Sequence, residues 1–319
     1  MRILFIGTPD FARESLDALY NSEHEIIGVV TNPDKPKGRG MKLAYSEVKE
    51  YAIQKNIKIF QPQKIRNNPE FIKEIKKLNP DIICVVVYGK FLPKELLEIP
   101  KYGCINVHPS LLPKYRGAAP IQWAIINGDK KTGVCTMYLN EEMDAGDIIL
   151  CEETPIEENE TTGDLWYRLS NIGANLLVKT VNMISSGIAP RIPQVGEPVL
   201  APMFDKEISK INWNKTSEEI KNLTRALNPI MGTYSIYNGK KIKFWEIENS
   251  NNNEIANNNI EFKAKEPGTI IVSDEKLGLY IKTGDGMVKI IEIQAENSKK
   301  MDIYSFLRGN KIKLGEILK

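Results

Sequence analysis

Residues 81–89 read DIICVVVYG, and this run decides the fold. Six apolar residues follow one another between Asp81 and Tyr88, with no polar residue alternating among them. A strand that faces water on one side alternates apolar and polar residues, whereas a strand buried on both faces does not. The run therefore predicts a central strand of a parallel sheet that is covered by helices on both faces.

The sequence on either side of this run alternates between strand-like and helix-like segments. Strand-like runs occupy 2–7, 25–31 and 57–60, and helical periodicity marks 11–21, 45–56, 69–79 and, as one long amphipathic helix, 161–186. This alternation predicts βαβ units and a doubly wound α/β sheet of Rossmann-like type, whose ligands bind beyond the carboxyl ends of the strands. Residues 7–12, GTPDFA, contain one glycine, and neither GxGxxG nor a P-loop occurs, so a dinucleotide or P-loop site is not predicted.

Length and composition indicate an ordinary globular protein with two domains. The chain has 319 residues, of which 42% are hydrophobic and 26% charged. No apolar run approaches the ~20 residues of a membrane span, and MRILFIG reads as a buried first strand and not as a signal peptide, so we expect a cytoplasmic protein. The four cysteines form no CxxC pair, and the chain has only two histidines. We therefore expect no metal site and buried reduced thiols at Cys84, Cys104, Cys135 and Cys151.

The pattern changes after residue 187. Residues 187–204, GIAPRIPQVGEPVLAPMF, have the proline- and glycine-rich composition of a linker. We therefore expect a domain at 1–189, a linker at 190–208 and a second domain at 209–319. In the second domain Thr216 and Glu219 predict a helix with a capping box, and YNGKK predicts a β-hairpin. Several strand-like runs then indicate an OB-like antiparallel barrel, and the asparagine-rich tract 249–259 indicates a surface loop without a site.

Polar side chains gather around one predicted strand end, in NVHPSLLPKYRGAAP at 106–120. Asn106 and His108 are two apart on a strand, so they point to one face, and Pro109 ends the strand. In DAGD, Asp144 and Asp147 flank a turn whose loop we expect to return to the same edge of the sheet. An ordinary turn explains the same letters, and the sequence does not choose between the two aspartates.

Direct acyl transfer fits these residue types best. An asparagine amide and an imidazole stabilise a developing oxyanion, and a histidine with a carboxylate moves protons. A carboxylate beside an imidazole also fixes its orientation. No GxSxG elbow occurs, so a covalent acyl-enzyme is not favoured.

The block 105–149 closely resembles the signature of the formyltransferases that use 10-formyltetrahydrofolate. The resemblance implies a Rossmann-like formyltransferase domain followed by an OB-like domain, with 10-formyltetrahydrofolate as the cosubstrate and no metal. It implies that Asn106, His108 and Asp144 are catalytic. It also implies that Ser110, Leu111, Leu112 and Pro113 contact the folate, although a plain loop that tucks two leucines into the core is the simpler interpretation of SLLP.

Basic residues indicate which kind of molecule accepts the formyl group. The loop 31–43 carries Lys35, Lys37, Arg39 and Lys42, and residues 209–319 hold 18 Lys and Arg against 14 Asp and Glu. Together with the resemblance, these features imply a protein that binds initiator methionyl-tRNA, with the loop and the second domain attracting phosphates. A monomer is a separate expectation, since no residue pattern indicates the oligomeric state. Rival interpretations are a sugar amine or water as the acceptor, or a non-catalytic RNA-binding protein. Arg116 is expected at the start of the next helix, where it serves a substrate or forms a salt bridge.

Overall fold

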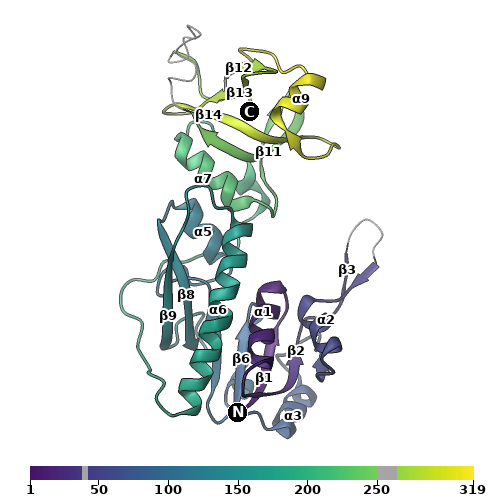
Figure 1. Cartoon of the computed structure of the whole chain (residues 1–319), viewed down its shortest axis with the longest axis vertical. Coiled ribbons are helices and arrows are strands. Elements are labelled where there is room, and N and C mark those ends of the chain that lie inside the picture. The colour runs from purple at the N-terminus through teal and green to yellow at the C-terminus, as the bar shows by residue number, and fades with distance from the viewer. Residues whose placement is uncertain (38–41, 251–263) are drawn as a thin grey trace. The chain divides into compact units, whose positions relative to one another are not determined.

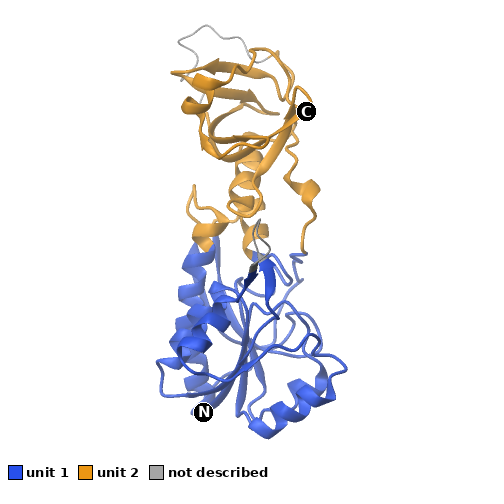
Figure 2. Ribbon diagram, turned by 90° about the vertical axis from the view of Figure 1, so that its right-hand side faces the viewer, with its two compact units in different colours: residues 1–120, 131–155, 166–202 blue, residues 121–130, 156–165, 203–319 orange. Residues whose placement is uncertain are grey.

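The computed structural model describes residues 1–37, 42–250 and 264–319 and divides the chain into two compact units. Unit 1 comprises residues 1–120, 131–155 and 166–202, and unit 2 comprises 121–130, 156–165 and 203–319 (Figure 2). Residues 38–41, which include Arg39, and most of the asparagine-rich tract lie outside the described residues. No helix of the described part is long and apolar enough to cross a membrane.

Unit 1 is built on a seven-stranded sheet in the order β5-β2-β1-β6-β7-β8-β9 (Figure 1). The strands from β5 to β7 are parallel, as predicted, and the central strand β6 is buried at every position. The strands β8 and β9 are antiparallel to their neighbours, so the sheet is mixed. The bounds are β1 Arg2–Gly7, β2 Glu25–Val30, β5 Ile59–Phe60, β6 Ile82–Val86, β7 Cys104–His108, β8 Lys131–Tyr138 and β9 Ile148–Pro155.

Helices cover both faces of this sheet. On one face α3 and α4 pack their apolar residues, including Phe71, Ile75 and Leu96, onto strands β1 and β6. On the other face α6 approaches β7 so closely that a Cβ on Gly173 would lie 2.9 Å from Val107. The bounds are α1 Asp10–Tyr20, α2 Glu47–Gln54, α3 Pro69–Leu78, α4 Lys94–Leu97 and α6 Thr162–Ser185. The helix α5, Pro120–Ile126, belongs to unit 2 from residue 121 on.

The expectation of four reduced thiols is wrong for two of the cysteines. Cys135 on β8 lies directly opposite Cys151 on β9, with their Cα atoms 4.1 Å apart, and the two are joined by a disulfide. Facing positions on antiparallel strands are close, which is what makes the pairing possible. Cys84 and Cys104 are free and buried.

The proline-rich segment after α6 is hydrogen-bonded to unit 1. Ile192 forms a β-bridge with Ile148 of β9, and Leu200 forms one with Arg116. After α6 the chain passes from unit 1 into unit 2 between Pro202 and Met203. The boundaries 1–189, 190–208 and 209–319 stay a prediction.

Unit 2 contains an antiparallel sheet in the order β10-β11-β14-β13-β12, with β15 paired to β14. The capping box at Thr216 and Glu219 is present, and the hairpin turn at Asn238 and Gly239 has the positive φ values that such a turn needs. The bounds are η1 Lys206–Ser209, α7 Ser217–Leu227, β10 Thr233–Tyr237, β11 Lys240–Asn249, β12 Ile270–Asp274, β13 Gly278–Lys282, β14 Met287–Ala295, β15 Met301–Asp302 and α9 Ile303–Gly309.

The residues after α9 connect the two edges of this sheet. The Lys319 backbone exchanges hydrogen bonds with Ile236 of β10, while the carbonyl of Glu316 accepts one from Ile270 of β12. Both edge strands are thereby covered, as in a barrel, around a core that includes Phe244 and Trp213.

Candidate active site

Asn106 and His108 lie on the sheet face that carries α4. They sit directly opposite Met137 and Cys135 of β8, and facing residues of an antiparallel pair share a face. On the same face of β7 the Cys104 thiol contacts the carbonyl oxygens of Leu96 and Leu97 in α4. The predicted pair therefore shares one face, at the carboxyl end of β7.

Asp144 reaches this pair by a route that was not predicted. Because β8 runs antiparallel to β7, the β8–β9 turn begins beside the amino end of β7, where the Leu139 amide donates to the Cys104 carbonyl at 2.8 Å. The turn then folds back so that Asp144 Oδ2 lies 3.7 Å from His108 Nδ1. Gly146 permits this, since a Cβ there would lie 1.8 Å from the Tyr138 carbonyl oxygen.

The structure separates the two aspartates that the sequence left open. Asp147 lies 3.5 Å from Arg191 as an ion pair. The Asp144 side chain is only 15% exposed, and its Oδ2 accepts a 2.8 Å hydrogen bond from the Gly117 amide. Gly117 has a φ of 127°, and a Cβ there would lie 2.6 Å from the Ala201 carbonyl oxygen, so this donor depends on glycine.

His108 is buried, and its ring is held by a hydrogen bond at Nε2. Nε2 lies 2.9 Å from the Tyr115 carbonyl oxygen, which accepts a hydrogen bond, so Nε2 carries the proton. In the neutral ring the lone pair is therefore on Nδ1, which faces Asp144. The distance of 3.7 Å is too long for a direct hydrogen bond, so a reacting group can lie within reach of both.

Asn106 offers an unused donor beside this pair. Its side chain is half-buried, and its amide has no hydrogen-bond partner among the residues that the structure describes. Such an amide, held on a strand, stabilises negative charge that develops next to it. Together the three side chains provide an anion-stabilising donor, a basic nitrogen and a carboxylate at one place.

The loop 110–113 follows directly. The Ser110 hydroxyl is buried and donates to the Lys114 carbonyl at 2.6 Å, which closes the turn. Leu112 packs on Cys135 and Met137 of β8, with Leu111 partly buried against the same cluster. Pro113 is half-buried. The loop is thus anchored to the sheet next to His108 and leaves Leu111 and Pro113 partly exposed.

Lys35 and Lys37 lie on β3 Lys35–Lys37, which pairs in antiparallel fashion with β4 Lys42–Ala44, where Lys42 lies. Lys35 is exposed. The pKa of Lys90 is lowered by the burial of Lys90 itself and by the positive charge of Lys35. Within the described residues, no hydrogen bond or ion pair joins this strand pair to Asn106, His108 or Asp144. The side chains of Lys37, Arg39 and Lys42 are not among the described ones, so the assignment of the four residues to tRNA binding stays a prediction.

Sequence reasoning missed Gln194. Its Nε2 donates to the carbonyl oxygens of Asp144 at 2.8 Å and Gly146 at 2.9 Å. Its Oε1 accepts from Arg116 Nε at 3.0 Å and Nη2 at 2.7 Å. Arg116 lies before α5, which begins at Pro120, so its expected place in that helix is wrong. Only linker composition marks Gln194 in the sequence, and no local signal identifies it.

No group of three or more His, Cys, Asp or Glu side chains that could hold a metal ion occurs in the described part of the chain.

Two family models match the chain. The model described as formyl transferase matches residues 1–181, and that described as formyl transferase, C-terminal domain, matches residues 203–311. Among curated proteins, a methionyl-tRNA formyltransferase from Clostridioides difficile is 48% identical over 319 residues, covering 100% of both chains. One from Caldanaerobacter subterraneus is 45% identical over 320 residues, again covering 100% of both.

Solved structures show the same fold at lower identity. An N-formyltransferase from Helicobacter canadensis, in complex with folinic acid and dTDP-3-aminofucose, has a TM-score of 0.67 and 22% identity, covering 92% of this chain and 99% of that one. HypX from Aquifex aeolicus in complex with tetrahydrofolic acid has a TM-score of 0.60 and 19% identity, covering 99% of this chain and 50% of that one.

Proposed function

The chain belongs to the formyltransferase family, among the methionyl-tRNA formyltransferases, and from that premise we propose how its own residues carry out the reaction. The enzyme transfers a formyl group from 10-formyltetrahydrofolate to the α-amino group of methionine on initiator methionyl-tRNA, at the start of protein synthesis.

The observation that carries the proposal is that Asn106 and His108 share one sheet face and that Asp144 lies beside His108. The amine attacks the formyl carbon, a C–N bond forms, and the carbonyl oxygen becomes an oxyanion. Asn106 donates its free amide to that oxyanion, which is worth a few kcal/mol in the transition state. The intermediate then collapses, the bond from the formyl carbon to N10 breaks, and N10 needs a proton.

His108 and Asp144 handle the protons in this proposal. The lone pair on His108 Nδ1 faces the Asp144 carboxylate, so a proton taken from the amine is held between them as it moves to N10. The Tyr115 carbonyl keeps Nε2 protonated and fixes the tautomer, and the Gly117 amide holds the carboxylate in place. The pair thus acts as one acid–base unit.

Substrate binding is assigned to two further groups of residues. Ser110, Leu111, Leu112 and Pro113 contact the folate through the anchored turn beside His108. Lys35, Lys37, Arg39 and Lys42, with the domain at 209–319, attract the phosphates of the tRNA. The partner is the initiator tRNA, and the enzyme acts as a cytoplasmic monomer.

The test is formylation of methionyl initiator tRNA with 10-formyltetrahydrofolate, scored as formyl-methionine in single turnover. We expect His108→Ala and Asp144→Ala to retain the fold and to lose at least ~10²-fold in rate. Asp147→Asn is the matched control from the same turn, and its rate should stay within a factor of about two, because its carboxylate pairs with Arg191 on the surface. Near-normal rates in both alanine variants would exclude the assignment.

A further inference from the structure

Two short segments join the β3–β4 strand pair to the rest of unit 1. Residues 31–34 lead from β2 into β3, and Tyr45 with Ser46 leads from β4 into α2, while β3 itself projects away from the sheet (Figure 1). The hydroxyls of the buried Thr31 and of Ser46 lie 2.8 Å apart, so a hydrogen bond joins the two segments. The proposed reaction assigns no role to the side chains of either segment.

Asp34 holds the first segment at the residue before β3. Its Oδ2 accepts a hydrogen bond from Lys49 Nζ at 2.6 Å, as an ion pair, and its Oδ1 accepts one from Gln61 Nε2 at 2.9 Å. Lys49 lies on α2, and Gln61 follows β5. The same Gln61 nitrogen donates to the Asn32 carbonyl oxygen at 2.9 Å. Two elements that are distant from Asp34 in the sequence therefore fix the start of β3.

Lys49 holds the second segment as well. Its ammonium group lies 4.1 Å from the centroid of the Tyr45 ring, whose face attracts a cation. Its backbone amide donates to the Ser46 hydroxyl at 3.1 Å, where Ser46 is the N-cap of α2. Because Asp34 precedes β3 and Tyr45 follows β4, one lysine side chain bridges both ends of the strand pair.

Asn32 ties the first segment to the catalytic edge of the sheet. Its Nδ2 donates to Thr8 Oγ1 and to the Tyr88 carbonyl oxygen, both at 3.0 Å. Thr8 follows β1 and Tyr88 follows β6, so the amide spans the carboxyl ends of three neighbouring strands, at the place where the strand order reverses. The next strand after β6 is β7, which ends at His108. The segment before β3 is thus held to the same edge as the catalytic residues.

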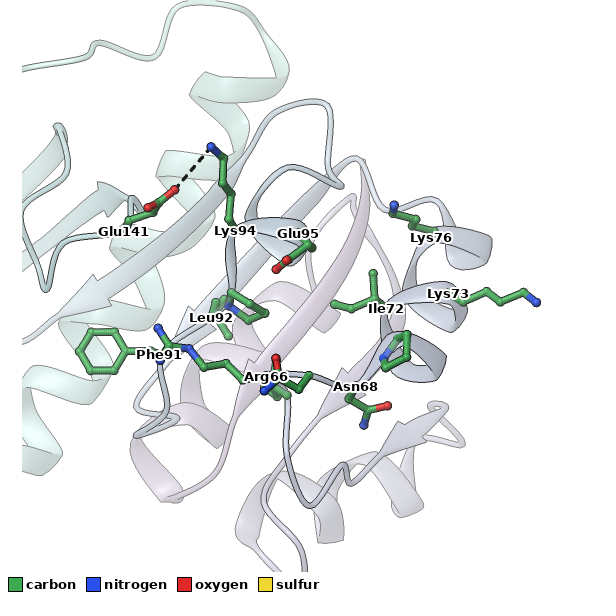
Figure 3. Close-up of a pocket in the computed structure, with 14 residues that line it drawn as sticks. Arg66, Asn68, Ile72, Lys73, Lys76, Phe91, Leu92, Lys94, Glu95 and Glu141 are labelled. Carbon is green, nitrogen blue, oxygen red and sulfur yellow. Dashed lines mark ion pairs between the residues drawn. The ribbon is translucent and has the colours of Figure 1, made fainter.

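The Asp34–Lys49 ion pair differs from an exposed ion pair of the same unit. Figure 3 shows such a pair, Lys94 and Glu141, at a cavity between α3 and the residues after β6. Its atoms are 3.7 Å apart and its side chains are 65% and 68% exposed, whereas the side chains of Lys49 and Asp34 are only 13% and 21% exposed. Exposed pairs contribute little to stability. A short, shielded pair whose carboxylate accepts a second hydrogen bond keeps one geometry, so it can orient the strands that it joins.

A carboxylate next to lysines that bind phosphates opposes that binding by its charge, so the value of Asp34 at this place lies in the geometry that it holds. We propose that Asp34 is a positioning residue for the acceptor tRNA. Its ion pair with Lys49 holds the β3–β4 strand pair in the direction that presents Lys35 to the tRNA phosphates. A surface that is already in its bound direction loses less freedom on binding, so the effect lies in tRNA affinity and not in the chemical step. This inference rests on the proposed tRNA binding by the basic residues between 31 and 43.

The test is steady-state formylation by the full-length variant Asp34→Asn. Asparagine offers one oxygen where the carboxylate offers two, so either Lys49 or Gln61 then faces an NH₂ group. We expect the KM for methionyl initiator tRNA to rise about tenfold, because the strand pair must be ordered on binding. Turnover at saturating tRNA and the KM for 10-formyltetrahydrofolate should stay within a factor of about two. Asp34→Glu keeps the charge and both oxygens, and it should recover most of the tRNA affinity.

Glu50→Gln is the matched control, since it removes one exposed carboxylate from α2, the helix that also carries Lys49. By charge alone both variants should bind tRNA slightly more tightly, so the KM for tRNA should stay level or fall in Glu50→Gln and rise in Asp34→Asn. An Asp34→Asn variant that follows Glu50→Gln would overturn the proposal. So would an equal rise in the KM for the formyl donor, because the variant then damages the whole sheet edge. If the wild type does not formylate methionyl initiator tRNA, the proposed function itself is wrong.

Discussion

At the scale of single residues, the free amide of Asn106 makes the clearest prediction. Its side chain is half-buried and has no partner among the described residues, so Asn106→Ala leaves no polar group unpaired and should hardly change the melting temperature. Turnover should fall by about 10²- to 10³-fold, because the lost donor acts on the transition state. The KM for the donor should stay near the wild-type value.

Steady-state kinetics at saturating substrates check this prediction. If Asn106→Ala turns over at the wild-type rate, groups other than the Asn106 amide stabilise the oxyanion. A rise in KM with unchanged turnover would instead make Asn106 a binding residue.

Residues with a local signal could be predicted, and residues placed by distant contacts could not. Asn106 and His108 share a strand, so their common face follows from their spacing alone. The approach of Asp144 depends on an antiparallel β8, which no local pattern reveals, and on the close contact at Gly146. Gln194 contacts Asp144 across 50 residues of sequence, and its proline-rich surroundings resemble a linker.

At the scale of elements, the segment after α6 holds the turn that carries Asp144. Gln194→Ala removes two donors to that turn and one acceptor for Arg116. We expect turnover to fall about tenfold through a misplaced carboxylate. Gln194→Glu should be worse than alanine, because it places a carboxylate against two carbonyl oxygens.

A positioning role is separated from a structural one by combining variants. If Gln194 acts through Asp144, Gln194→Ala should add little loss to Asp144→Ala, whereas independent effects would multiply. Val195→Ala is the control, since Val195 is 84% exposed in the same segment. A full tenfold further loss in the double variant would contradict the positioning role.

The disulfide between Cys135 of β8 and Cys151 of β9, with the two buried free cysteines, leads to a prediction about thiol reactivity. Burial raises the pKa of Cys104 to about 12 and also raises that of Cys84, so neither forms a reactive thiolate at pH 8. The native protein should therefore incorporate no iodoacetamide at pH 8. After reduction the exposed Cys151 should be alkylated first. Labelling of Cys151 without reductant, mapped by mass spectrometry, would show that the pair is not oxidised.

At the scale of the whole molecule, neither compact unit is one continuous stretch of the chain. Residues 121–130 and 156–165 belong to unit 2, where Arg225 donates to the carbonyl oxygens of Glu157 and Glu160. Thr162 likewise donates to the Ala226 carbonyl. A chain cut near residue 206 would leave the segment 156–165 without these partners. The division of labour between the units is therefore better tested in the full chain.

The last prediction uses charge to locate the tRNA. Lys240 and Lys241 are exposed on β11 of unit 2. If residues 209–319 bind tRNA, Lys240→Gln/Lys241→Gln should weaken tRNA binding and flatten its salt dependence by roughly one logarithmic unit of slope for each phosphate contact removed. Turnover at saturating tRNA should persist, because the catalytic residues are untouched.

Lys55→Gln/Lys58→Gln is the control, since it removes the same charge from exposed positions of unit 1. Long-range attraction depends on net charge, so both double variants should slow association slightly and equally. Only a direct contact changes the slope of affinity against salt, because only contacted phosphates release their counterions. If tRNA affinity depends equally on salt in the two double variants, the tRNA does not contact the hairpin of β10 and β11, whatever the absolute affinities.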